Sequence, residues 1–205
     1  MRKVILGSFV SADGVMQAPG GPSEDTVGGF QHGGWVFPYF DETVGAAMDD
    51  ILTQEYELLL GRKTYDIFAA HWPRAEDSPD AETAKVFNRT RKWVVTSSRD
   101  PLAWNNSVAL HDPVADIARI KKEEGPNILI QGSSTVVQAL VAHELIDEIT
   151  LLIFPVVLGK GKRLFGDKFA GALKLTKSQT SPSGVVINTY VPAGNIHVGS
   201  FELPE

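Results

Sequence analysis

Short runs of consecutive apolar residues, separated by stretches with helical periodicity, constrain the fold of this chain more than any other feature. A strand that is buried on both faces of a parallel sheet lacks polar alternation, and these runs have that pattern. Between them, apolar residues recur three or four positions apart, as in amphipathic helices. Strands and helices therefore alternate, which predicts an α/β fold with a parallel sheet flanked by helices. The predicted strands are residues 3–10, 57–61, 92–96, 128–132 and 147–157, and the predicted helices are residues 41–54, 63–70, 114–124 and 135–144.

The C-terminal part of the chain has a different pattern. Residues 173–177 alternate between apolar and polar side chains, and residues 185–191 are rich in β-branched ones, with a turn signal at 182–184 between them. This pattern is typical of an antiparallel hairpin. No internal repeat, low-complexity tract or linker divides the 205 residues. We therefore predict a single domain over residues 1–205, with a mainly parallel central sheet and an antiparallel C-terminal hairpin.

Charge and cysteine content exclude several classes of function. Nineteen Lys and Arg against 25 Asp and Glu leave a net charge of −6, so a nucleic-acid partner is not expected, although a local basic pocket for one phosphate remains compatible. The absence of cysteine excludes disulfides, thiolate metal sites and a cysteine nucleophile. The five histidines lack metal-ligand spacing, so no metal site is expected. Without a signal peptide or an apolar window of about 18 residues, we expect a cytoplasmic protein with no membrane partner.

The residues that follow four of the predicted strands are small, polar or basic. The carboxyl ends of parallel strands lie at one edge of the sheet, which is where α/β proteins bind ligands. Two of these ends carry Arg or Lys beside hydroxyl groups, and two lead into helix N-termini, which bind phosphates. They predict a ligand with several phosphates, such as a dinucleotide with a 2′-phosphate; solvated basic residues and helix caps are the alternative. The four ends are Ala12-Asp13-Gly14, Gly61-Arg62-Lys63-Thr64, Thr96-Ser97-Ser98-Arg99 and Gln131-Gly132-Ser133-Ser134.

A long segment at residues 17–34 contains six glycines and two prolines and has no apolar periodicity. Loops of this length inside a compact domain are usually lids or binding loops, so we expect this segment to be flexible and to close over a site. A solvated insertion without function is the alternative. The standard dinucleotide fingerprints are absent: residues 159–164 match only the first two glycines of the G-x-G-x-x-G motif.

Taken in order, the motifs resemble the dihydrofolate reductase-like superfamily, and in particular the reductase domain at the C-terminus of the bifunctional riboflavin-biosynthesis deaminase-reductase. The resemblance covers nearly the whole chain, and its last motif is the most distinctive. The motifs that carry it are residues 11–14, 58–65, 94–98, 128–133 and 145–165.

This resemblance implies an NADPH-dependent reductase whose cofactor lies across the strand ends. Many members have Gly-Gly, often with a cis bond, where this chain has Gly132-Ser133. The pyrophosphate and adenosine side would be bound by Gly61, Arg62, Lys63 and Thr64. The 2′-phosphate would be bound by Thr96, Ser97, Ser98 and Arg99. A helix N-terminus would be placed against the diphosphate by Gly132, Ser133, Ser134 and Thr135.

On the substrate side, the resemblance implies hydride transfer to a small heterocyclic or ribosyl substrate, as in 5-amino-6-(5-phosphoribosylamino)uracil reductase. Dihydrofolate reductase activity and a non-enzymatic nucleotide-binding role are the alternatives. We expect Asp13 to orient the hydroxyl or amine groups of the substrate, with Asp41 or Glu42 as the second candidate, for proton delivery; turn formation and helix capping are the structural alternatives for these carboxylates.

A homodimer is expected as well. The related stand-alone reductases usually pair, and residues 149–157 and 185–191 have the pattern of long apolar strands with exposed edges. A bare strand edge favours association unless another element covers it.

Overall fold

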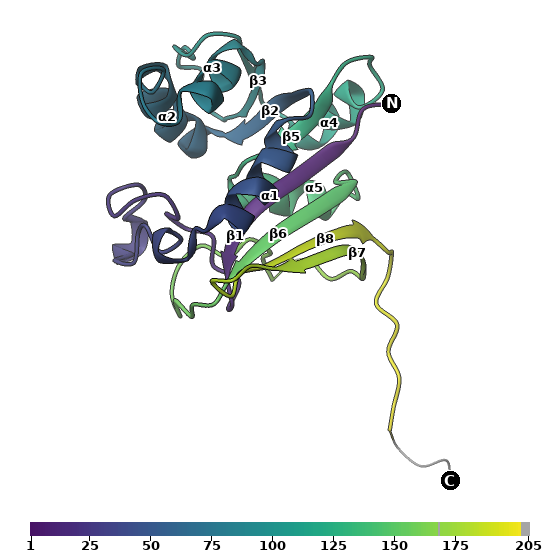
Figure 1. Ribbon diagram of the computed structural model, residues 1–205. Coiled ribbons are helices and arrows are strands. Elements are labelled where there is room, and N and C mark those ends of the chain that lie inside the picture. The colour runs from purple at the N-terminus through teal and green to yellow at the C-terminus, as the bar shows by residue number, and fades with distance from the viewer. Residues whose placement is uncertain (168, 202–205) are drawn as a thin grey trace.

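The first strand, β1 (Val4–Ser11), lies in the interior of an eight-stranded sheet (Figure 1). The structure is a computed structural model that describes residues 1–167 and 169–201. The other strands are β2 (Tyr56–Gly61), β3 (Lys92–Val95), β4 (Ser107–Leu110), β5 (Asn127–Ile130), β6 (Glu148–Phe154), β7 (Leu173–Thr180) and β8 (Val186–Pro192).

The strand order is β4-β3-β2-β5-β1-β6-β8-β7. All neighbours from β4 to β6 are parallel, whereas β8 is antiparallel to β6 and β7 is antiparallel to β8. The prediction of a mainly parallel sheet that ends in an antiparallel C-terminal hairpin is therefore confirmed.

Helices cover both faces of the sheet. Two helices, α4 (Pro113–Ile120) and α5 (Ser134–Val141), pack on one face. The other face carries α1 (Glu42–Leu52), α2 (Arg62–His71) and α3 (Ala81–Arg89). In the described part of the chain, no helix is long and apolar enough to cross a bilayer.

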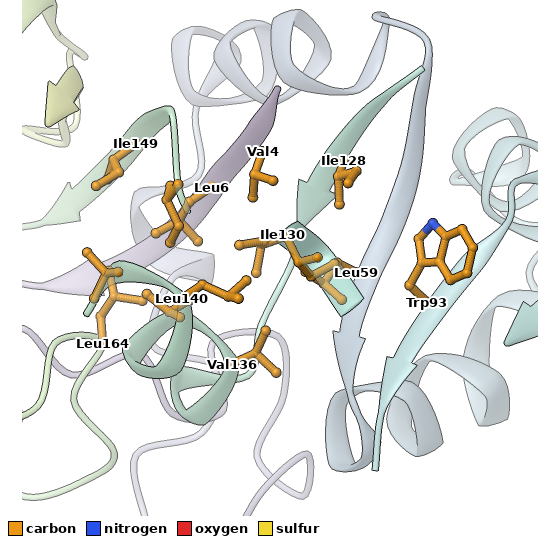
Figure 2. Close-up of a cluster of buried hydrophobic side chains, with 14 of the residues drawn as sticks. Val4, Leu6, Leu59, Trp93, Ile128, Ile130, Val136, Leu140, Ile149 and Leu164 are labelled. Atoms are coloured by element: carbon orange, nitrogen blue, oxygen red, sulfur yellow. The ribbon is translucent and has the colours of Figure 1, made fainter. Parts of the chain in front are cut away.

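Alternation along the central strands decides which face each apolar side chain joins. Val4 and Leu6 of β1 pack toward α5, while Ile5 between them packs on the opposite face. Figure 2 shows Val4 and Leu6 gathered with Val136 and Leu140 of α5. Each such fully buried side chain contributes roughly 1.5–3 kcal/mol. This double-sided burial explains why the strands read as uninterrupted apolar runs.

Two elements were not predicted from the sequence. Helix α3 lies between the helix predicted at residues 63–70 and the strand predicted at residues 92–96, and only Ala84 and Phe87 of its nine residues are buried. Strand β4 is an edge strand, and Val108 and Ala109 in its centre are exposed. Both elements bury too few side chains to produce a strong apolar pattern.

The bare edges expected at residues 149–157 and 185–191 are both wrong for their strand portions, since β8 lies between β6 and β7. Strand β6 pairs with β1 on one side and with β8 on the other, so both of its edges are covered. The free edge belongs to β7, where Lys174 and Lys177 are exposed. Lysines on an edge strand discourage strand-to-strand association.

Candidate functional site

A cavity of about 280 Å³ lies at the carboxyl edge of the parallel strands, and we call it the sheet-edge cavity. Its walls come from β1, the start of the 17–34 segment, α2, and the junction between β5 and α5. The polar residues that line it are Ser8, Gln17, Glu24, Asp25, Lys63, Thr64, Gln131, Ser133, Ser134 and Lys162.

The carboxyl ends of β2 and β5 meet beside this cavity. The N–H of Gly61 donates to the carbonyl of Gly132 at 3.2 Å. A Cβ on Gly61 would lie 2.2 Å from Oγ of Ser133, so only glycine permits this approach. Gly132 has a φ of 108°, in the region that favours glycine, and the Gly132–Ser133 peptide bond is cis. Two of the predicted cofactor segments are thus in direct contact.

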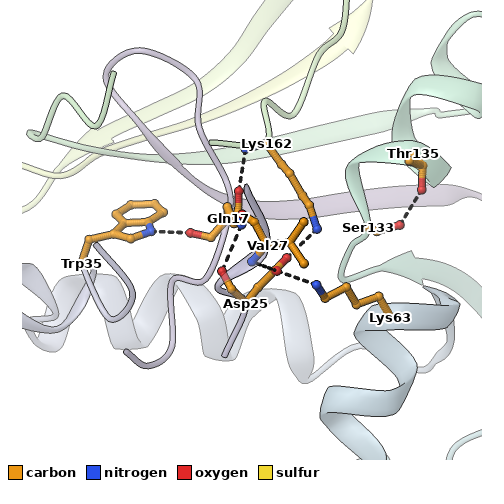
Figure 3. Close-up of polar contacts among 8 residues, drawn as sticks. All are labelled: Gln17, Asp25, Val27, Trp35, Lys63, Ser133, Thr135 and Lys162. Carbon is orange, nitrogen blue, oxygen red and sulfur yellow. Dashed lines mark hydrogen bonds and ion pairs between the residues drawn. The ribbon is translucent and has the colours of Figure 1, made fainter. Parts of the chain in front are cut away.

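Each of these segments leads into a helix. The N-cap residue of α2 is Gly61, which has no side chain to cap the helix. The N-cap residue of α5 is Ser133, whose side chain does not cap the helix. The hydroxyl of Ser133 instead lies 2.8 Å from the hydroxyl of Thr135 (Figure 3). First-turn N–H groups that no side chain caps are suited to bind phosphate oxygens.

The third predicted cofactor segment follows β3 along the same edge but lies outside the sheet-edge cavity. Val95 of β3 pairs with Gly61, so Thr96, Ser97, Ser98 and Arg99 come directly after the neighbouring strand end. Arg62 also lies outside the cavity, where its Nε donates to Asp66 at 2.9 Å. Its Nη1 is buried and has no hydrogen-bond partner among the residues that the structure describes. The candidate binding edge therefore extends from the cavity toward β3.

Asp25, in the long segment at residues 17–34, pairs with two lysines of the cavity wall. Its Oδ1 lies 2.5 Å from Nζ of Lys63, and its Oδ2 lies 2.6 Å from Nζ of Lys162 (Figure 3). Burial alone would raise the pKa of Asp25, but the two ammonium groups outweigh it and lower this pKa. The carboxylate is therefore charged near neutral pH.

Gln17 holds this part of the segment in place. Its Nε2 donates to the carbonyls of Asp25 and Val27, and its Oε1 accepts from the N–H of Lys162. Its own carbonyl accepts from Nε1 of Trp35 at 2.8 Å (Figure 3). The beginning of the 17–34 segment thus forms a defined wall of the sheet-edge cavity, while its closure over a ligand stays a prediction.

Glu24, next to Asp25, has a contrasting environment. Its Oε2 accepts from the N–H of Gly20 at 2.6 Å, and the side chain lines the cavity. Burial raises the pKa of Glu24. The pKa values of these two consecutive carboxyl groups are therefore shifted in opposite directions.

Gln131 extends β5 by one residue and presents an amide to the cavity. Its Nε2 is buried and has no hydrogen-bond partner among residues 1–167 and 169–201. A Cβ on Gly7 of β1 would lie 3.4 Å from this nitrogen, so the missing side chain leaves room beside it. A buried donor without a partner costs roughly 1–3 kcal/mol, which an acceptor on a ligand would recover.

Asp13 does not line the cavity; its contacts are those of an anchor. Its carboxylate accepts from Oγ of Ser11 at 2.6 Å and from the N–H groups of Leu158 and Gly159 at 3.0 and 2.8 Å. The Ser11 hydroxyl and these N–H groups outweigh partial burial and lower the pKa of Asp13 to about 2. Asp13 thus joins the end of β1 to the segment after β6, and its predicted action on a substrate remains untested.

Asp41 likewise lies outside the cavity. It is the N-cap of α1, where it accepts from the N–H of Val44 at 3.0 Å and from that of Ser183 at 2.9 Å. Partial burial would raise the pKa of Asp41, but these hydrogen bonds outweigh it and lower the pKa to about 2. A carboxyl group with such a low pKa is a poor proton donor near neutral pH, so the contacts match the capping alternative.

Three charged cavity residues, Glu24, Asp25 and Lys162, were not singled out from the sequence, and Gln131 was named only within the fourth strand end. Lys162 belongs to the most distinctive motif, and Gln131 stands directly before Gly132, so their positions in motifs were available signals. The acidic pair lies in a segment without periodicity, which provides no such signal. Among the described residues, no three His, Asp or Glu side chains cluster as a metal site would require.

Solved structures show the class to which this fold belongs. Dihydrofolate reductase from Enterococcus faecalis, in complex with NADP(H) and RAB-propyl, has a TM-score of 0.57 at 14% identity, covering 93% of this chain and 96% of that chain. A pyrimidine reductase-like protein from Corynebacterium diphtheriae has a TM-score of 0.60 at 14% identity, covering 95% of this chain and 93% of that chain. The predicted dihydrofolate reductase-like fold is therefore confirmed.

The family follows from sequence comparison. Residues 2–187 match the model of the RibD C-terminal domain, and the chain belongs to this family, as its motifs predicted. The uncharacterised protein YyaP of Bacillus subtilis (strain 168) is 30% identical over 193 residues, which cover 92% of this chain and 94% of that protein.

We expect the substitution Asp13→Asn to destabilise the protein, because one amide oxygen cannot replace both carboxylate oxygens toward Leu158 and Gly159. Hydrogen bonds to a charged group contribute roughly 1.5–3 kcal/mol. The pKa of Asp13 in the folded protein lies below the ordinary value of 3.8, so this stabilisation is complete above about pH 4 and is lost as pH falls toward about 2. Thermal unfolding of both proteins over this pH range measures the difference.

Asp49→Asn is the matched control, since Asp49 is exposed on α1. Equal melting temperatures for Asp13→Asn and wild type near neutral pH would contradict the anchoring role. A tenfold loss of kcat/KM at unchanged stability would instead support the substrate-orienting role.

Proposed function

We propose that this protein is an NADPH-dependent reductase that transfers a hydride to a small heterocyclic or ribosyl substrate. One observation carries the proposal: Lys63 and Thr64 at the start of α2 line the same cavity as Ser133 and Ser134 at the start of α5. These residues come from two segments that are far apart in the sequence, and both were predicted to bind cofactor phosphates. Membership of the RibD C-terminal domain family supports the same class of reaction.

The residues at this edge fit a phosphorylated dinucleotide. The first turns of α2 and α5 have no side-chain caps, and Nη1 of Arg62 is buried without a partner in the described part of the chain. We assign residues 61–64 and 132–135 to the diphosphate and residues 96–99 to the 2′-phosphate. When bound, NADPH would supply the hydride.

The remaining polar groups of the cavity are assigned to the substrate. Gln131 Nε2 would donate a hydrogen bond to a carbonyl oxygen or ring nitrogen, because no described residue accepts from it. Reduction of a polar double bond also consumes a proton. Glu24 lines the cavity, and its raised pKa means that it keeps its proton up to a higher pH than an ordinary Glu. We therefore assign proton delivery to Glu24 rather than to Asp41. Residues 17–20 shield these groups from water.

Two alternatives remain for the substrate side. Dihydrofolate is retained as an alternative substrate because of the structural similarity to dihydrofolate reductase. A non-enzymatic nucleotide-binding role would retain cofactor affinity without turnover. A screen for consumption of NADPH with dihydrofolate, the aminopyrimidine ribosyl phosphate and simple carbonyls separates these cases. We further propose that the protein acts in the cytoplasm on a small molecule and not on nucleic acid.

We expect the protein to bind NADPH at least tenfold more tightly than NADH. A charge-assisted contact to the 2′-phosphate contributes roughly 1.5–3 kcal/mol, or one to two decades in affinity. Energy transfer from the four tryptophans to the reduced nicotinamide measures both dissociation constants. Arg99→Gln should remove most of the preference, and Arg119→Gln, on the exposed face of α4, should leave it intact. Equal dissociation constants in the wild type would refute the assignment.

We expect Gln131→Met to lower kcat/KM by about tenfold or more while the melting temperature stays the same or rises. Removing a buried donor without a partner relieves a cost of roughly 1–3 kcal/mol, so stability and activity should change in opposite directions. Affinity for NADPH should change less than twofold. Gln54→Met, at an exposed position after α1, is the control for the substitution itself. Unchanged kcat/KM would exclude Gln131 from substrate binding.

We also propose that the protein is a homodimer. Residues 193–201 extend away from the sheet (Figure 1), and Ile196, Val198 and Phe201 in this segment are exposed. Such an apolar segment favours contact with a second copy. Light scattering at micromolar concentration should show twice the chain mass of 22.3 kDa, and the double variant Val198→Asp, Phe201→Asp should show the chain mass. A wild-type mass of 22.3 kDa would reject the dimer.

A further inference from the structure

Two lysines from distant parts of the chain converge on one carboxylate at the sheet-edge cavity. Lys63 belongs to the first turn of α2, whereas Lys162 lies in the segment between β6 and β7. Their ammonium groups contact opposite oxygens of Asp25, at 2.5 and 2.6 Å (Figure 3). The Asp25 side chain is 9% exposed, while those of Lys63 and Lys162 are 43% and 37% exposed. The lysines are therefore accessible to a ligand, and the carboxylate fills the space between them.

We propose that Lys63 and Lys162 together bind a phosphoryl group of the ligand, and that Asp25 is an internal counter-ion which this phosphoryl group displaces. The inference rests on the proposed function in one respect: it assumes that the ligand of the cavity carries phosphate. It adds a residue, Lys162, to the anion site and makes Asp25 a determinant of affinity for phosphorylated ligands.

The pair of ammonium groups has the chemistry of an oxyanion site. Each Lys63 and Lys162 ammonium can donate three hydrogen bonds, and in the described part of the chain the structure gives each of them one, to Asp25. A phosphoryl group has more charge and more acceptor oxygens than a carboxylate, so it can replace Asp25 between the same two donors. Ser133 and Ser134 at the start of α5 line the same cavity and would add helix N–H donors.

The surroundings of Asp25 allow its side chain to leave without unfolding the segment. Gln17 holds the main chain through the carbonyls of Asp25 and Val27, and these bonds do not involve the Asp25 carboxylate. Oδ1 of Asp25 also accepts from the N–H of Val27 at 3.2 Å, which is a contact within the segment itself. The next residues, 26–29, are exposed, and a Cβ on Gly28 would meet no atom within 4 Å. The carboxylate can therefore turn toward solvent.

The phosphoryl group can come from two sources, the dinucleotide or a phosphorylated substrate. Four probes distinguish them when titrated calorimetrically into the purified full-length protein: NADPH, NADH, pyrophosphate and ribose 5-phosphate. Tighter binding of the dinucleotides and pyrophosphate after loss of Asp25 assigns the lysine pair to the cofactor. Tighter binding of ribose 5-phosphate alone assigns the pair to the substrate.

The deciding variant is Asp25→Asn, which retains an oxygen for the N–H of Val27 but cannot form ion pairs. We expect the dissociation constant for at least one phosphate probe to fall about tenfold, because the competing group no longer occupies the site. Lys162→Met should raise the same constant about tenfold, and it should abolish the gain when combined with Asp25→Asn. Glu82→Gln is the matched control, since it removes a carboxylate that also pairs with a lysine, Lys85, but that lies on α3 outside the cavity. Its effect should stay below twofold.

Unchanged or weaker binding of all four probes by Asp25→Asn would overturn the proposal, as would an equal gain in Glu82→Gln. If circular dichroism shows that Asp25→Asn does not fold, hydrogen exchange of the wild-type protein tests the proposal instead. Saturation with pyrophosphate or ribose 5-phosphate should accelerate exchange at residues 25–29, and unchanged or slower exchange with both probes would overturn the proposal. The proposed function fails separately, through absence of NADPH-dependent turnover in the wild type.

Discussion

The contact between the carboxyl ends of β2 and β5 is the constraint on which the rest of the site depends. A side chain at Gly61 would begin 2.2 Å from Oγ of Ser133, so the two strands can end side by side only because Gly61 has none. This approach directs the first turns of α2 and α5 toward the same cavity. Lys63 and Thr64 consequently line the same cavity as Ser133. In the sequence they are separated by about 70 residues, which a chain of βαβ crossovers can span.

The long segment at residues 17–34 places a carboxylate between two lysines that would otherwise repel each other at this edge. Lys63 and Lys162 approach each other in a chain whose net charge is −6, and the single Asp25 carboxylate forms an ion pair with each ammonium group. Gln17 holds the main chain around Asp25 in place by donating to the carbonyls of Asp25 and Val27. An acidic protein can therefore hold a concentrated basic site, provided that its own loop supplies the counter-ion.

The carboxyl groups show how far residue type alone can predict a role. Asp13 stands in a strand-end motif and Asp41 at the start of a predicted helix, yet both accept backbone N–H groups and have pKa values of about 2. Glu24 has no motif around it, but it lines the cavity and burial raises its pKa. The difference arises from partners such as Leu158, which lies 145 positions from Asp13 in the chain.

The sequence by itself determined the buried strands and the family, and it singled out two of the segments that line the sheet-edge cavity, because apolar runs, turn residues and strand-end motifs are local patterns. It did not reveal α3 or β4, whose few buried residues leave a weak periodic signal. Only the tertiary structure decided which charges meet: Asp25 lies 38 positions from Lys63 and 137 from Lys162. Ion pairs and pKa values depend on distances in space, and no local pattern encodes contacts at such separations.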